Sequence, residues 1–188
     1  MERSFEAVLV EQCATTLAGV KPASLFRYQG ADQRQSREAA ARWAKELAPY
    51  GITVRILKVC PQTGACLIYL YRAGWLRSIL SEPSNRAFLA RQGYQTDQDC
   101  PGLLRQLSRR LCLEREFPHE IGVFLGYPLE DVVGFIENRG RNYTCCGYWK
   151  AYGDPEAAQK RFDQYRRCTA ACCEQFRKGT AITQLIAA

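Results

Sequence analysis

Two neighbouring segments with strand-like composition constrain the fold of this chain more than any other feature. Residues 52–59 and 65–71 are rich in β-branched and aromatic side chains, and residues 60–64 between them include a proline and a glycine. A link this short and turn-like predicts that the two strands pair as a hairpin. A further candidate strand covers residues 23–28, so we expect a small mixed β-sheet in the first part of the chain.

Helical patterns dominate the rest of the sequence. Helices are expected over residues 4–18 and 34–48, the second with apolar side chains at i, i+3, i+4 and i+7. Residues 143–152 are expected to be extended or irregular. The later part of the chain predicts helices over residues 74–81, 83–92, 101–115, 118–125, 128–138 and 154–178, with a short terminal helix after Gly179. Strands early and helices late favour the α+β class.

A single domain over residues 1–188 is the expected organisation, with the sheet in about 1–75 and a predominantly helical part in about 76–188. The chain is long enough for one hydrophobic core, and its 47% hydrophobic and 24% charged residues are ordinary for a globular protein. No stretch approaches the ~20 apolar residues of a membrane span. The first residues lack the pattern of a secretory signal, so we expect a cytoplasmic protein without membrane contact.

The balance of charge is mildly basic. Lys and Arg number 26 against 19 Asp and Glu, a net charge of +7 that favours anionic partners such as nucleic acid, phosphates or an acidic protein. The basic residues are distributed over residues 105–110, 139–141 and 160–167 rather than gathered in a tail. This distribution is typical of solvated helix faces.

Residues 119–136 have the spacing of a helix-turn-helix. Two short predicted helices meet at Gly126, with Gly122 four residues before it and Val132 six residues after it. In a DNA-binding module the second helix would enter the major groove. Here that helix begins with two acidic residues that would repel phosphates, and it has no Arg, Lys, Asn or Gln until its last residue. An architectural helical hairpin is therefore favoured over nucleic-acid binding.

The same segment starts with the only histidine of the chain, His119, followed by Glu120. The second histidine of a zincin helix is missing, so any mechanism that needs two histidines is excluded. A lone histidine is more often a structural residue than a ligand. A neutral imidazole could nevertheless bind a metal or act as a base.

Cysteine is the main compositional anomaly, because the chain has ten and five of them fall between residues 145 and 173. Without an export signal, reduced thiols are the default. Cys145 lies in a segment where Trp149 and Tyr152 flank Lys150, and these two aromatic side chains are candidates for contacting a cofactor. No Cys-x-x-Cys spacing is present.

Three interpretations of these thiols stay open. Cys168 and Cys172 are four residues apart on one predicted helix face, so a thiol-bearing loop facing them could assemble three or four soft ligands. Thiolates select zinc, iron–sulfur clusters or Cu(I). A second interpretation is a buried stripe, because free cysteine packs as a small hydrophobic residue. A third is a redox-active pair of thiols.

A third candidate site lies near the start of the chain, where Cys13 and Lys21 flank a predicted helix end. A cysteine nucleophile needs a nearby cation or base that lowers its pKa. Lys21, His119 or Lys150 could supply that charge. Catalysis by Cys13, with Lys21 or Lys150 binding an anionic substrate, is therefore a second hypothesis.

Three runs of this sequence resemble a bacterial family of unknown function, numbered 3793: residues 13–26, 119–136 and 147–153. The resemblance covers nearly the whole chain and implies an anaerobic host, with genes that accompany flavodoxin and ferrous-iron uptake genes. It implies no established activity. Among the thiols it points to Cys13, Cys145, Cys168 and Cys173 as shared family positions.

These observations lead to one principal expectation and two alternatives. The principal one is a metal- or cofactor-binding protein linked to iron or redox metabolism, with iron, an iron–sulfur cluster or zinc as the group bound and a redox protein as partner. Its metal ligands would be Cys145, Cys168, Cys173 and His119. The alternatives are a thiol-dependent enzyme that acts on an anionic small molecule and, less favoured, a nucleic-acid binder.

Overall fold

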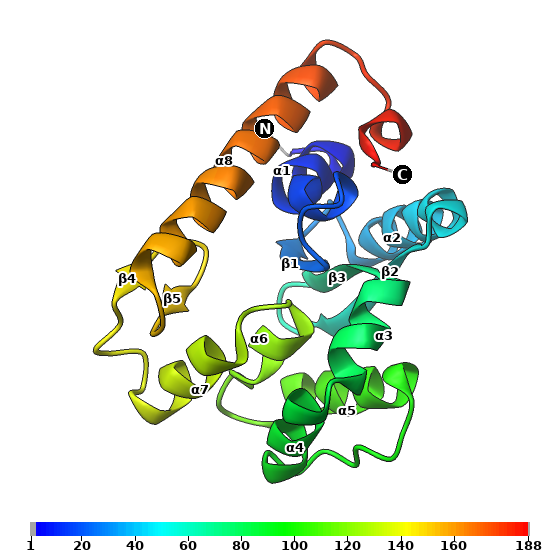
Figure 1. Cartoon of the computed structure of the whole chain (residues 1–188). Coiled ribbons are helices and arrows are strands. Elements are labelled where there is room, and N and C mark those ends of the chain that lie inside the picture. Colours follow the sequence, from blue (N-terminus) through cyan, green and yellow to red (C-terminus); the bar gives the residue numbers. More distant parts are fainter. Residues whose placement is uncertain (1–2, 188) are drawn as a thin grey trace. The chain divides into compact units, whose positions relative to one another are not determined.

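A computed structural model describes residues 3–187 of the chain (Figure 1). The chain forms two compact units, one comprising the residues up to Gly74 together with those from Arg167 onward, the other comprising Trp75–Arg166. The α+β class is confirmed, because the sheet and helices expected from the sequence are both present. None of the helices within 3–187 has the length and apolar character needed to cross a bilayer.

The first unit contains a three-stranded sheet of β1 (Ala23–Tyr28), β2 (Ile52–Val59) and β3 (Cys66–Arg72), in the order β1-β3-β2. The expected hairpin is β2–β3, with a register shift between Ile56 and Lys58. Both pairings are antiparallel, whereas the sequence predicts a mixed sheet. The strands that a helix connects, β1 and β2, run in the same direction, but β3 lies between them, so no parallel pair forms.

The sheet of this unit is covered by helices. α1 (Phe5–Leu17) and α2 (Gln33–Leu47), followed by the short helix η1 (Ala48–Tyr50), confirm the two predicted helices to within about a residue at each end. The terminal helix is a single 3-10 segment, η2 (Ile182–Leu185). The shared core contains side chains such as Phe5, Leu9, Phe26, Ile68 and Leu70.

The second unit is mainly helical. It contains most of α3 (Ala73–Ser81), then α4 (Pro83–Arg91), α5 (Cys100–Leu113), α6 (Ile121–Phe124), α7 (Leu129–Glu137) and the first part of α8 (Pro155–Arg177). The predicted helix over residues 118–125 is shorter than expected: three-residue turns occupy its start, as the bond from Ile121 N–H to Pro118 O shows. Residues 143–152 contain a small antiparallel pair, β4 (Cys145–Cys146) and β5 (Lys150–Ala151).

Candidate functional site

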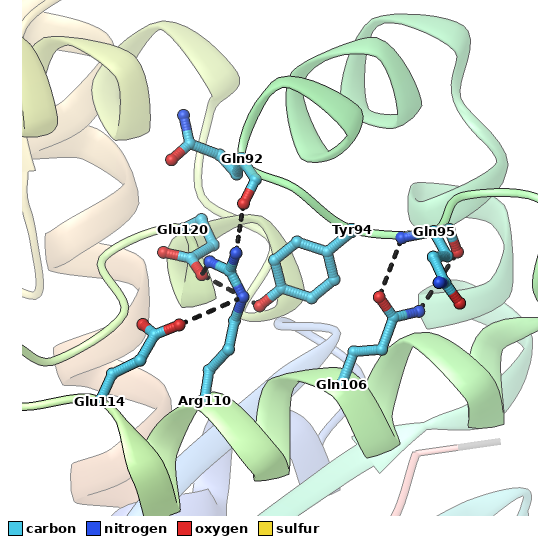
Figure 2. A network of polar contacts seen from close by, with 7 residues as sticks. All are labelled: Gln92, Tyr94, Gln95, Gln106, Arg110, Glu114 and Glu120. Atoms are coloured by element: carbon cyan, nitrogen blue, oxygen red, sulfur yellow. Dashed lines mark hydrogen bonds and ion pairs between the residues drawn. The ribbon is translucent and has the colours of Figure 1, made fainter.

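The histidine and glutamate that begin the α6 segment have separate environments. Glu120 is 4% exposed, and its Oε1 accepts hydrogen bonds from the Tyr94 hydroxyl at 3.0 Å and from Arg110 Nη1 at 2.8 Å. Figure 2 shows this network, in which Arg110 also reaches Glu114 and the backbone carbonyl of Gln92. Glu120 is therefore a structural residue that holds α6 against α5. His119, by contrast, is exposed beside an apolar pocket.

Gly122 and Gly126 allow the close crossing of α6 and α7, as their helix-turn-helix spacing predicts. A Cβ added at Gly122 would lie 2.7 Å from Val132 Cγ2, so only glycine fits there. Gly126, with φ of +75°, makes the left-handed turn between the helices. The second helix buries Asp131 and Val132 rather than presenting a polar face. The architectural interpretation of the hairpin thus has a direct packing basis.

Asp131 connects α7 to the β4–β5 segment. Its Oδ2 accepts a hydrogen bond of 2.7 Å from the indole Nε1 of Trp149, and its Oδ1 accepts bonds of 2.6 and 3.1 Å from the backbone N–H groups of Tyr152 and Gly153. The carboxylate is 4% exposed, so these three donors replace its water shell. Gly134, one turn later, leaves room for the ring of Tyr152, which a Cβ would meet at 2.5 Å.

These contacts shape one wall of a pocket of about 360 Å³ within the second unit. Trp149 stacks on Tyr127 with ring centroids 4.9 Å apart and an interplanar angle of 23°. His119 meets the Phe135 ring edge-on at 4.8 Å. The remaining lining is mostly apolar and comes from the α6–α7 and β4–β5 segments: Phe117, Ile121, Gly122, Leu125, Asp131, Val132, Cys146, Gly147, Tyr148 and Lys150.

Lys150 is the cation of this pocket. Its Nζ donates a hydrogen bond of 2.7 Å to Gly140 O and lies 4.9 Å from the ring centroid of Tyr143 and 5.9 Å from that of Phe135. Within residues 3–187, no carboxylate lies within ion-pair distance of it. In the part of the chain that the structure describes, the contacts of the Lys150 ammonium are therefore with a carbonyl oxygen and aromatic rings.

Three of the residues predicted from the sequence therefore come together here: His119, Trp149 and Lys150 all line the pocket. Tyr152 does not line it, but its backbone bonds to Asp131 and its buried hydroxyl lacks a hydrogen-bond partner in the described part of the chain. The candidate residues predicted from the sequence did not include Tyr127, Asp131 or Phe135. Asp131 is one of three acidic residues in α7, and no local pattern distinguished it from Glu130 and Glu137.

The four predicted metal ligands are divided between the two units. Cys145 and His119 belong to the second unit, Cys168 and Cys173 to the first. Over the described residues 3–187, no group of three or more His, Cys, Asp or Glu side chains is arranged to hold a metal ion. Cys172 belongs to the core of the first unit, and Cys168 and Cys173 pack against it. Burial raises the pKa of Cys168 to about 11, which stabilises the thiol rather than the metal-binding thiolate. This packing matches the buried-stripe interpretation.

Cys13 and Lys21 do lie near one another, as the catalytic hypothesis requires, but in the wrong environment. Cys13 is fully buried, and this burial raises the pKa of its thiol despite the neighbouring Lys21 charge. Burial also lowers the pKa of Lys21 to about 8. A nucleophile needs a thiolate that a substrate can reach, so the site lacks both requirements for catalysis by Cys13. Lys150, the third predicted catalytic residue, belongs to the aromatic pocket of the second unit.

A family model described as "Protein of unknown function (DUF3793)" matches residues 9–186. Neither the comparison with curated proteins nor that with solved structures gave a significant match. The resemblance seen in the sequence is thus confirmed over nearly the whole chain.

Proposed function

The chain belongs to the DUF3793 family of unknown function, and from its own geometry we propose that it binds a small, flat organic molecule in the aromatic pocket. The observation that carries the proposal is the convergence of Trp149, Tyr127 and Phe135 on one concave space of about 360 Å³. Small-molecule sites have about 300–1,000 Å³, apolar or aromatic walls and a few polar groups. His119 and Lys150 are those polar groups here.

The rigidity of the wall supports this proposal. Because Asp131 binds both the indole of Trp149 and the backbone of residues 152–153, the orientation of the indole does not depend on a ligand. A preformed aromatic face reduces the entropy lost on binding. Stacking against such a face favours planar rings over flexible aliphatic chains.

The proposed function retains the cofactor binding expected from the sequence, but its site is the aromatic pocket rather than the cluster of cysteines. The metal, iron and redox roles, the redox partner and the cytoplasmic location stay predictions. The aromatic pocket is lined by residues from two of the three segments that resemble the family, 119–136 and 147–153.

Titration with N-phenyl-1-naphthylamine, a neutral aromatic probe whose fluorescence rises in apolar surroundings, tests the proposal. We expect saturable binding with one site per chain. Cys146→Trp places a large ring at the exposed rim of the pocket and should weaken binding at least about tenfold. The matched control is Cys112→Trp, the same change at an exposed cysteine outside the pocket, and should stay within about twofold.

Two results would overturn the proposal. One is the absence of saturable binding by the folded wild-type chain. The other is an equal loss of affinity in both tryptophan variants, which would locate the probe elsewhere.

A further inference from the structure

We infer that the molecule bound in this pocket is an aromatic anion, whose negatively charged oxygen group contacts Lys150 and His119. The inference rests on the proposed function and names the class of its ligand. It is carried by the placement of charge around the pocket rather than by the apolar walls.

The first observation is that the charge of Lys150 is incompletely satisfied. An ammonium group has three donors, and the structure shows one of them used, in the bond to Gly140 O. The rings of Tyr143 and Phe135 attract the cation, but they neutralise none of its charge. Lys150 is half-buried, so water screens it less than it screens a surface lysine.

The second observation concerns the carboxylate that shares the pocket. Asp131 could have been the partner of Lys150, yet both of its oxygens are bound by N–H groups of Trp149, Tyr152 and Gly153. Three N–H donors stabilise this charge in place. The ion-pairing capacity of Lys150 is therefore left for a ligand.

The third observation is a second donor near the same ring. His119 contacts Phe135 edge-on, and Lys150 lies over the same ring at 5.9 Å, so both polar groups lie next to the same aromatic side chain. In the described chain the His119 imidazole makes no hydrogen bond. A neutral imidazole keeps one N–H donor, so His119 can contribute a hydrogen bond to an anion even when it is uncharged.

Together these groups describe a ligand with a flat ring and an anionic oxygen group. The ring would lie against Trp149 and Phe135, and the carboxylate, sulfonate or phosphate would accept hydrogen bonds from Lys150 and His119. Charge-assisted bonds of this kind are stronger than neutral ones, particularly where the walls exclude water.

The test compares two fluorescent probes of nearly equal shape. 8-Anilino-1-naphthalenesulfonate carries a sulfonate on the ring system of N-phenyl-1-naphthylamine, which is neutral. We expect the wild-type chain to bind the sulfonate at least about tenfold more tightly. Lys150→Gln keeps a donor for Gly140 O but removes the charge, and should lower the affinity for the sulfonate about tenfold, at least about fivefold more than it lowers the affinity for the neutral probe.

Two further variants complete the design. Lys150→Arg retains the charge and should restore sulfonate binding. Lys160→Met removes one positive charge from an exposed position of α8 outside the pocket, so it controls for the net charge of the chain. Displacement of the sulfonate probe by 1-naphthoate or by 1-naphthyl phosphate then distinguishes a carboxylate ligand from a phosphate ester.

The outcomes separate the two claims. If the neutral probe binds and the sulfonate has no advantage, or if Lys150→Gln and Lys160→Met weaken the sulfonate equally, the anion inference is wrong and the proposed function survives. The same conclusion follows, without any variant, if wild-type binding of the sulfonate does not exceed that of the neutral probe. If the neutral probe does not bind at all, the proposed function itself fails and the inference fails with it.

Discussion

Replacing Asp131 by asparagine tests whether this carboxylate holds the pocket wall in place. An asparagine has one oxygen and one NH2 group where Asp131 has two acceptor oxygens. If the amide oxygen accepts the hydrogen bonds from the backbone N–H groups of Tyr152 and Gly153, the NH2 group faces the indole N–H of Trp149. Both of these groups are donors, so no hydrogen bond forms between them. In the opposite orientation, two backbone bonds are lost instead.

The cost follows from burial. Trp149 is 9% exposed and Asp131 4%, so little water can replace the lost bond. Leaving a buried donor unsatisfied costs about 1–3 kcal/mol, and the lost bond is charge-assisted, which adds to that range. We expect Asp131→Asn to lower the free energy of unfolding by about 2–3 kcal/mol. In a Trp149→Phe background the indole N–H is absent, so the same change should cost about 1–2 kcal/mol less.

Urea unfolding followed by far-ultraviolet circular dichroism measures these differences without depending on tryptophan emission. The control is Asp163→Asn, which removes a partly exposed carboxylate paired with Arg166 at 3.0 Å, and should cost less than about 1 kcal/mol. The reasoning is refuted if Asp131→Asn is as mild as the control. It is refuted equally if the cost is the same with and without the indole.

Two further predictions concern buried charges. Glu120→Ala should destabilise the chain by about 2–4 kcal/mol in the same assay, because it leaves Arg110 and the buried Tyr94 hydroxyl without their shared acceptor. The control is Glu114→Ala, at a more exposed position 3.6 Å from Arg110, which should cost under about 1 kcal/mol. Equal losses of stability in the two variants would contradict the structural role of Glu120. Lys21 has a folded pKa of about 8 against about 10.4 in the unfolded chain, so between these values the unfolded state binds the extra proton and stability rises with pH. From pH 8 to 9.5 the free energy of unfolding should rise by up to about 2 kcal/mol through this titration, and Lys21→Met should abolish this contribution. If the free energy of unfolding changes with pH in the same way in both proteins, Lys21 does not titrate as described.

Local sequence signals predicted most of the secondary structure, because they act within a few residues. The composition of residues 52–59 and 65–71 and the turn between them predicted the β2–β3 hairpin, and Asp154 with Pro155 predicted the start of α8. The insertion of β3 between β1 and β2 is a long-range pairing that no local pattern encodes. The expected mixed sheet was wrong for that reason.

In the candidate site too, local sequence signals identified individual residues but did not predict how they come together. Sequence alone singled out His119, Trp149 and Lys150 as unusual residues, since each is rare or stands in a distinctive local context. Their meeting in one pocket depends on Asp131, whose bonds to the β4–β5 segment cross about twenty residues of chain. Helical spacing likewise placed Cys168 and Cys172 on one face, but whether that face binds metal or packs into a core depends on what lies opposite. Only the tertiary structure shows that Cys172 lies among the apolar side chains of the first unit, where a neutral thiol is more stable than a thiolate.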